Sequence, residues 1–207
     1  VPVIRYFIDT EFIEDGRTID LISIGIVTED GSREYYAVVE EIGDEEGDLY
    51  KRIVRGRWLM ENVVSHLPLK VNEKGKPRIV PPTNVYPQNP RFDLDIDHPA
   101  VLPLHVIAKQ VKAFLLAPGE PMQLWTYYSA YDHVVISWLW GPMVNRPKGI
   151  PMFSFDLMQF AASLGMDDAN LPQQTGQLHN ALDDARWTRD AWRYLTGAAE
   201  RMNGRES

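Results

Sequence analysis

The chain has no cysteine among its 207 residues. Disulfide bonds and thiolate metal sites are therefore excluded. Long apolar runs are also missing, because no stretch approaches the roughly 18–20 residues that a membrane-spanning helix requires. No secretory signal is visible, and we therefore expect a cytoplasmic protein without a membrane partner.

Positive charge is scarce as well. The chain carries 21 Lys and Arg against 29 Asp and Glu, a net charge of −8. This balance disfavours a protein that grips long duplex DNA, since such binding depends on many Lys and Arg contacts to phosphate. The negative charge does not exclude an enzyme that holds a short nucleic-acid end, because bound metal ions reverse the local electric field of an acidic site.

The chain does contain enough apolar residues to form a hydrophobic core. Hydrophobic residues make up 44% and aromatic residues 11% of the sequence. This composition is typical of a globular protein, and the length is most simply that of one domain, residues 1–207.

Three apolar segments at the start of the chain predict β-strands, over residues 4–12, 21–28 and 33–39. Acidic turns that end in glycine, at 14–16 and 29–31, separate them. Strands with such short connections form an antiparallel meander.

The rest of the chain predicts mainly helices. We expect helices over 49–64, 104–116, 132–139, 155–164 and 179–195, and one further strand over 123–127. Strands followed by helices in this order indicate an α/β fold, in which helices flank a mixed sheet.

Residues 67–103 differ from the rest because they hold eight of the 15 prolines. Proline lacks the backbone donor of regular structure, so we expect none in this segment. We interpret it as a surface insertion without a catalytic part. The alternative is that it covers the substrate or a partner subunit.

Two acids stand out in the first strand. Asp9 and Glu11 are two residues apart, so both side chains should leave the same face. Neighbouring carboxylates in an apolar strand repel each other and lose hydration, and a divalent cation would compensate for both effects. The alternative is that Glu11 lies in solvent beyond the strand end.

Two later segments carry further acids at helix starts. Asp132 follows a strand and a turn of small residues, and His179 precedes a helix whose first turns hold Asp183 and Asp184. Taken separately, each pattern is explained as well by helix capping and by the helix dipole.

Taken together, the order Asp-x-Glu, Asp and His-x4-Asp resembles the DEDDh exonucleases of the ribonuclease-H-like superfamily. The resemblance implies a ribonuclease-H-like fold and matches Asp9, Glu11, Asp132 and Asp184 to the metal ligands of that family. The spacing from His179 selects Asp184 over its neighbour.

Several segments look more specifically like the RNase AS family of 3′-exoribonucleases, which prefer polyadenylate. They are residues 5–16, 21–25, 34–38, 130–133 and 139–143. This likeness covers most of the chain outside the proline-rich segment.

The resemblance also implies a mechanism. Two Mg²⁺ or Mn²⁺ ions would be held by the four acids, with Glu11 and His179 as catalytic residues and His179 as the base for the attacking water. The substrate would be single-stranded RNA 3′ ends, hydrolysed to nucleoside 5′-monophosphates. Related enzymes are commonly homodimers, and we expect a homodimer here.

Exonucleases must also hold a single-stranded end, and bases stack on aromatic side chains. Phe12, Tyr128, Tyr131 and His133 adjoin the catalytic motifs and are candidates for substrate binding. For each of them core packing is the alternative.

Three other functions stay open at this point. A DNA-directed 3′→5′ exonuclease would use the same site. A catalytically inactive nucleic-acid-binding module would lack metal-dependent activity, although all five expected residues are present. An endonuclease or resolvase of the same fold would also use a carboxylate cluster, but the His-x4-Asp element favours an exonuclease.

Overall fold

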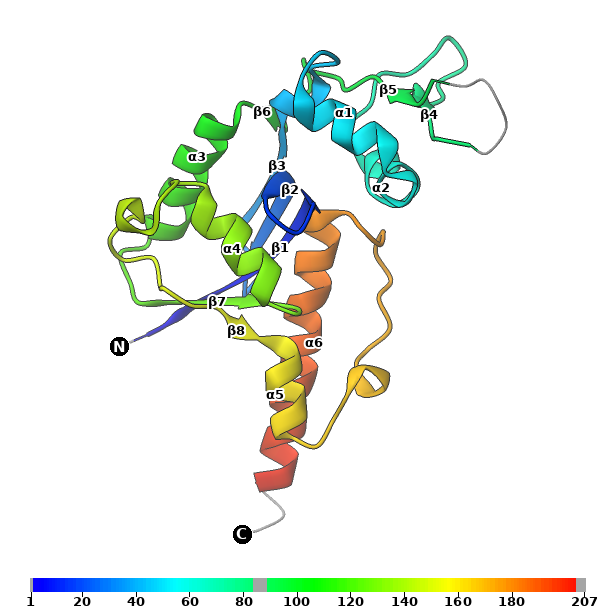
Figure 1. Ribbon diagram of the computed structural model, residues 1–207. Helices are drawn as coiled ribbons and strands as arrows, with labels where there is room; N and C mark the ends of the chain where they lie inside the picture. The colour runs from blue at the N-terminus through cyan, green and yellow to red at the C-terminus, as the bar shows by residue number, and fades with distance from the viewer. Residues whose placement is uncertain (1, 84–88, 204–207) are drawn as a thin grey trace.

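A six-stranded mixed sheet lies at the centre of the molecule (Figure 1), for which a computed structural model describes residues 2–83 and 89–203. The strands run in the order β6-β3-β2-β1-β7-β8. Strands β1 to β3 pair antiparallel, while β6, β7 and β8 each pair parallel with a neighbour. Their bounds are β1 Ile4–Glu14, β2 Ile19–Thr28, β3 Glu34–Val39, β6 Val101–Leu102, β7 Met122–Thr126 and β8 Phe155–Asp156. The expected α/β fold, in which a three-strand antiparallel meander is extended by parallel strands, is confirmed.

Helices cover both faces of this sheet, α3 and α4 on one side and α5 and α6 on the other (Figure 1). The α-helices are α1 Asp48–Arg55, α2 Arg57–Asn62, α3 Leu104–Leu116, α4 Ala130–Trp138, α5 Leu157–Ser163 and α6 Ala181–Asn203. Four short 3₁₀ turns join them among the described residues: Glu40–Gly43, Val64–His66, Met143–Asn145 and Asp168–Asn170. Among the described helices, none combines the length and the apolar character needed to cross a membrane.

Three expected helices have clearly different bounds in the structure, and the one predicted over 179–195 runs from Ala181 to Asn203. The helix predicted over 49–64 is split into α1 and α2, because Gly56 adopts an extended backbone conformation between them. The helix predicted over 155–164 begins two residues later, since Phe155–Asp156 forms strand β8 and Asp156 then caps α5 by accepting from two backbone amides.

The proline-rich segment was wrongly expected to lack regular structure. Strands β4 (Ile79–Val80) and β5 (Arg91–Phe92) pair antiparallel as a small second sheet. Phe92 is only 1% exposed and Leu94 is also buried, so two apolar side chains of this segment are anchored in the main core. Residues 84–88 of the segment lie outside the described residues.

Alternation along β1 divides the core into two halves. Tyr6 and Ile8 pack into the larger cluster with residues of α3 and α4, whereas Phe7 packs with Trp192 of α6. Because successive side chains of a strand point to opposite faces, Asp9 continues the row that faces α6. The strand pattern therefore directs this acid toward the start of the last helix.

Gly25 allows α6 to approach the sheet closely at that point. This glycine pairs with Asp9 across β1 and β2. A Cβ atom built on Gly25 would lie 2.2 Å from the carbonyl oxygen of Ala181, the first residue of α6. Only glycine fits this approach, which brings the beginning of α6 directly over the carboxylate strand.

Candidate active site

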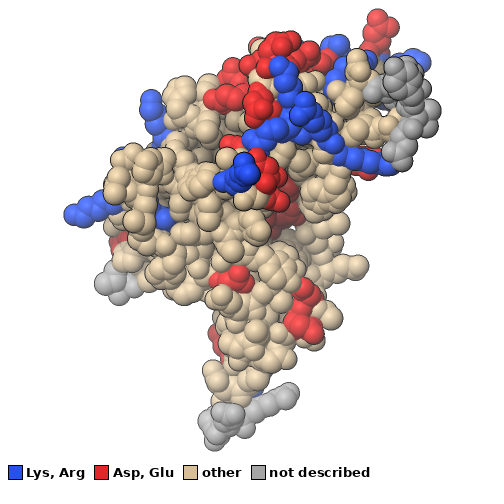
Figure 2. All heavy atoms as spheres, in the orientation of Figure 1, with Lys and Arg blue, Asp and Glu red and all other residues tan. Residues whose placement is uncertain are grey.

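The cleft opens where β1 extends beyond its parallel neighbour. Strand β7 pairs with β1 only as far as Phe7 and Trp125, so the second half of β1 is left free on that side for the start of α4. The cavity there holds about 500 Å³. Its lining residues are Asp9, Thr10, Glu11, Phe12, Tyr127, Tyr128, Tyr131, Asp132, Gln174, Leu178, His179, Asp184, Trp187 and Thr188. Figure 2 shows Asp and Glu side chains in the hollow at the middle of this face, with Lys and Arg side chains over α1 and α2 beside it.

Asp132 reaches the cleft from α4. It does not cap that helix, because the N-cap position is Ser129. Its Oδ1 atom instead accepts hydrogen bonds from the backbone amide of Thr10 (2.9 Å) and from the Thr10 hydroxyl (2.6 Å). Since Thr10 lies between the two acids of β1, these bonds fix Asp132 against the carboxylate strand.

Residues of the first and third motifs form a compact group. Ligand atoms of Glu11, His179 and Asp184 all lie within 4.8 Å of one another, and the Nδ1 atom of His179 is 4.0 Å from Oε1 of Glu11. Glu11 is buried, so the interpretation that it lies in solvent beyond the strand is wrong. The structure thus brings together all five residues of the three motifs, because Asp9 and Asp132 line the same cleft.

Asp183 turns away from the cleft, as the spacing argument expected. Its Oδ1 atom forms an ion pair with Arg186 at 2.7 Å, and its other oxygen accepts from the backbone amide of Gln177. Adjacent helical residues diverge by about 100°, which explains why Asp184 faces the cleft and its neighbour does not.

Burial raises the pKa of every carboxyl group in the cluster, and repulsion by the other cluster acids adds to the rise for Asp9 and Glu11. Burial is the main cause for each. It raises the pKa of Glu11 to about 8, with the charges of Asp184 and Asp132 adding to the effect. The pKa of Asp132 is raised to about 7. The pKa of Asp9 is raised well above its ordinary value, and that of Asp184 is also raised, although Gln174 opposes the rise.

A divalent cation fits this donor set. Among the described residues, those that line the cleft include four carboxylates and no Lys or Arg, so no side-chain cation offsets the clustered acids. Hard cations such as Mg²⁺ and Mn²⁺ prefer oxygen ligands. Binding of such an ion would stabilise the charged forms of the acids, which burial and repulsion disfavour.

His179 lies outside the helix, in a conformation that non-glycine residues seldom adopt. Its φ angle is +60°, and Tyr128, which also lines the cleft, has a φ of +54°. Such strained positions concentrate at functional sites. The edge of the Trp58 ring from α2 packs against the His179 ring, with 4.8 Å between ring centroids, and a hydrogen bond between Gln177 and His66 ties the same loop to the residues after α2.

Several residues of this site were not identified from the sequence. Gln174 donates a hydrogen bond to Asp184, and Trp58 contacts the imidazole, but each reaches the site only through tertiary packing. Thr10 could have been identified from the sequence, because it lies between the two acids of the first motif.

Three of the four aromatic candidates for substrate binding line the cleft. Phe12 and Tyr131 are stacked, with ring centroids 5.7 Å apart and an interplanar angle of 11°. Tyr128 is 53% exposed, and its hydroxyl donates to Asp168. His133 is not among the described residues that line the cleft. Its Nδ1 atom lies 2.7 Å from the Ser154 hydroxyl, on another side of α4.

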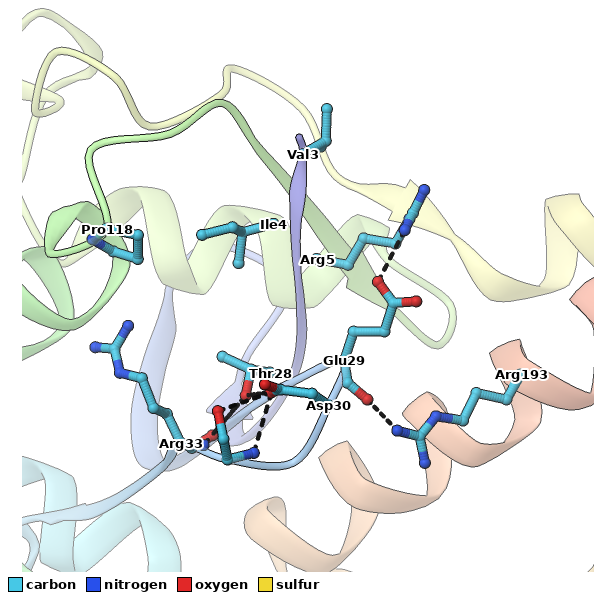
Figure 3. A pocket seen from close by; sticks show the side chains of 10 residues that line it. Val3, Ile4, Arg5, Thr28, Glu29, Asp30, Arg33, Pro118 and Arg193 are labelled. Atoms are coloured by element: carbon cyan, nitrogen blue, oxygen red, sulfur yellow. Dashed lines mark hydrogen bonds and ion pairs between the residues drawn. The ribbon is translucent and has the colours of Figure 1, made fainter. Parts of the chain in front are cut away.

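A second cavity, of about 510 Å³, lies near the start of β1 (Figure 3). Its basic side chains already have partners among the described residues. Arg5 pairs with Glu29 at 2.8 Å, Arg193 donates to the Glu29 carbonyl, and Arg33 donates to the Phe114 carbonyl. The arginine side chains of this cavity are therefore already paired, whereas the carboxylates of the cleft have no Lys or Arg beside them among the described residues that line it.

Sequence comparison decides the family. No family model matches the chain. Two proteins of Mycobacterium tuberculosis, from strains H37Rv and CDC 1551, are each 35% identical to it over 201 residues. Each match covers 97% of this chain and 98% of the relative, and both relatives are named 3′-5′ exoribonuclease. The chain belongs to this family.

A solved structure, the Mg²⁺- and Mn²⁺-bound form of Pop2p from S. pombe, is also similar at 12% identity and a TM-score of 0.45, covering 93% of this chain and 81% of that one. Membership of the exoribonuclease family, together with the acidic cleft, identifies the chain as a nuclease whose carboxylate–histidine cluster is suited to a divalent cation.

Proposed function

We propose that the chain is a 3′→5′ exoribonuclease that hydrolyses single-stranded RNA to nucleoside 5′-monophosphates with the aid of two divalent cations. The observation that carries this proposal is the convergence of Asp9, Glu11, Asp132, Asp184 and His179 on one cleft. The names of the two mycobacterial relatives support the choice of RNA and of the 3′ end.

Each residue of the cluster has a role in this proposal. The four carboxylates would hold Mg²⁺ or Mn²⁺, which when bound supply stabilisation of phosphate charge and a more acidic water. His179 stands at the edge of the cluster and is 39% exposed, so it can exchange a proton with solvent. It would take the proton of the attacking water through one of its ring nitrogens. The Glu11 carboxylate, whose Oε1 atom lies 4.0 Å from Nδ1 of the imidazole, would help to orient it.

The aromatic side chains supply a surface for the end of the strand. Phe12, Tyr128 and Tyr131 line the same cavity as the carboxylates, and stacking on aromatic rings holds single-stranded bases without regard to duplex geometry. A preference for adenine-rich tails rests on the resemblance to the RNase AS family and is part of the proposal.

End-labelled oligonucleotides test the proposal directly. With Mg²⁺ or Mn²⁺, a single-stranded RNA labelled at its 5′ end should shorten to a ladder, and excess EDTA should abolish the reaction. Full hydrolysis in EDTA would refute the cation requirement. Cleavage of a circular RNA, which has no 3′ end, would refute the assignment as an exonuclease. Equal rates on oligo(A), oligo(U) and oligo(C) would remove only the adenine preference.

The same assay separates RNA from DNA. A DNA-directed exonuclease would use an identical cluster, so a DNA oligonucleotide of matched sequence is the necessary control. Faster hydrolysis of the DNA would refute RNA as the preferred substrate without affecting the proposed chemistry.

A further inference from the structure

A second hollow adjoins the cleft along α4. It holds about 420 Å³ and lies between that helix and the turn that connects β1 to β2. Tyr131 lines both this side hollow and the carboxylate cleft, so the two spaces meet at one aromatic side chain. A strand whose end lies in the cleft would therefore find the side hollow next in its path.

One wall of the side hollow is an apolar stripe. Tyr131, Val134 and Trp138 are spaced three and four residues apart, which places them on one face of α4. They are 57%, 38% and 50% exposed. From Tyr131 to Trp138 the helix rises by about 10 Å. An exposed indole at this distance offers a second stacking surface beyond the one at the cleft.

The opposite wall carries a free cation. Arg17 is exposed, and its guanidinium forms no ion pair or hydrogen bond within the described part of the chain. Its backbone amide is held by Asp15, which fixes the turn. The nearby Glu14 carboxylate accepts from a backbone amide of the same turn. Because both acids would weaken attraction of an anion, stacking should contribute more here than charge does.

We propose that the side hollow binds a nucleotide of single-stranded RNA upstream of the 3′-terminal residue, with its base on Trp138 and a phosphate at Arg17. This inference rests on the proposed function and extends it to the length of RNA that the enzyme recognises. Continuity with the cleft through Tyr131 and the unpaired positive charge favour this occupant over a second protein chain.

Single-turnover kcat/KM for RNA oligonucleotides of two to eight residues measures the effect. In the wild type, kcat/KM should rise with length until the strand reaches the side hollow and then level off. Trp138→Ala should lower the ratio of octanucleotide to dinucleotide rates about fivefold or more, the usual value of one stacked base. Trp138→Phe should restore most of that ratio, since any aromatic face can stack.

Arg17→Ala tests the phosphate contact independently. The logarithm of octanucleotide affinity against the logarithm of salt concentration should become shallower by about 0.7, the contribution of one phosphate contact on a single strand. Arg17→Lys should retain the slope. Arg201→Ala, at the far end of α6, is the matched control and should change neither the slope nor the length dependence.

The outcomes are separable. A wild type that hydrolyses RNA without any length dependence overturns the side hollow as a subsite and leaves the exonuclease intact. Equal losses on the dinucleotide and octanucleotide in Trp138→Ala overturn it too, as does a change from dimer to monomer in that variant, which would make the hollow an interface. Absence of hydrolysis on every RNA refutes the proposed function itself.

Discussion

Replacement of Glu11 by glutamine should stabilise the cation-free protein while it abolishes activity. Glu11 is only 8% exposed, so burial raises the pKa of its carboxyl group, and the negative charges of Asp184 and Asp132 raise that pKa further. Glutamine has nearly the same shape but carries no charge. The substitution should therefore remove the cost of burial and the repulsion that the cation-free protein bears whenever Glu11 is ionised.

The pKa difference sets the magnitude. In the folded protein the pKa of Glu11 is about 8, against an ordinary value of 4.5. Each pH unit corresponds to about 1.4 kcal/mol, so ionised Glu11 should cost the fold up to about 5 kcal/mol at pH 9. Because the folded-state pKa is the higher one, the contribution of Glu11 to stability should be fully present below pH 4.5 and be lost as the pH rises through 8.

Chemical unfolding in excess EDTA measures this difference. At pH 9 we expect Glu11→Gln to exceed the wild type by about 2–5 kcal/mol, and at pH 5 by less than about 1 kcal/mol. Glu200→Gln, an exposed residue of α6, is the control and should match the wild type at both values. Added Mn²⁺ should stabilise the wild type by binding to the folded state and should stabilise Glu11→Gln less. If Glu11→Gln has wild-type stability at pH 9, burial and repulsion do not destabilise ionised Glu11.

Four further predictions concern the same site and its assembly. His179→Ala should lose about 10²–10⁴-fold in rate yet keep its Mn²⁺ affinity by calorimetry, and a wild-type rate from pH 6 to 9 would contradict its role as base. Asp184→Asn should weaken both Mn²⁺ binding and rate, whereas Asp183→Asn should change neither by much; the reverse result would mean that the two acids exchange roles. Trp58→Ala should lower kcat more than it changes KM, because the indole edge supports the imidazole, and Trp58→Phe should recover most of the rate. Light scattering should give about twice the 23.7 kDa of one chain, and a monomer at micromolar concentration would contradict the expected homodimer.

The sequence was sufficient for elements with a strong local pattern. The alternating β1 segment and its acidic turn predicted the meander, because a period of two and turn residues are local properties. The same period placed Asp9 and Glu11 on one face. The boundary between α1 and α2 was missed, since the tolerance of a helix for glycine depends on what surrounds it, and Gly56 ends α1 here.

The candidate site divides in the same way. Motif order selected Asp132, although the local pattern around it is explained as well by a helix cap. No local pattern could show the bonds from Thr10 that hold Asp132 in the cleft, because they join residues 122 positions apart. His133 is the opposite case: it follows Asp132 in the sequence but is not among the described residues that line the cleft, since adjacency in the sequence does not say which side of a helix faces a cavity.

By itself the sequence predicted which groups would carry the chemistry and determined the period that aligns two of them on one strand. Only the tertiary structure decided that the four carboxylates and His179 share one cleft. That arrangement depends on three non-local features: the early end of β7, the close approach that Gly25 permits to α6, and the packing of α2 against the loop before α6. Local propensity cannot specify such contacts, because their free energy comes from burying surfaces that lie far apart along the chain.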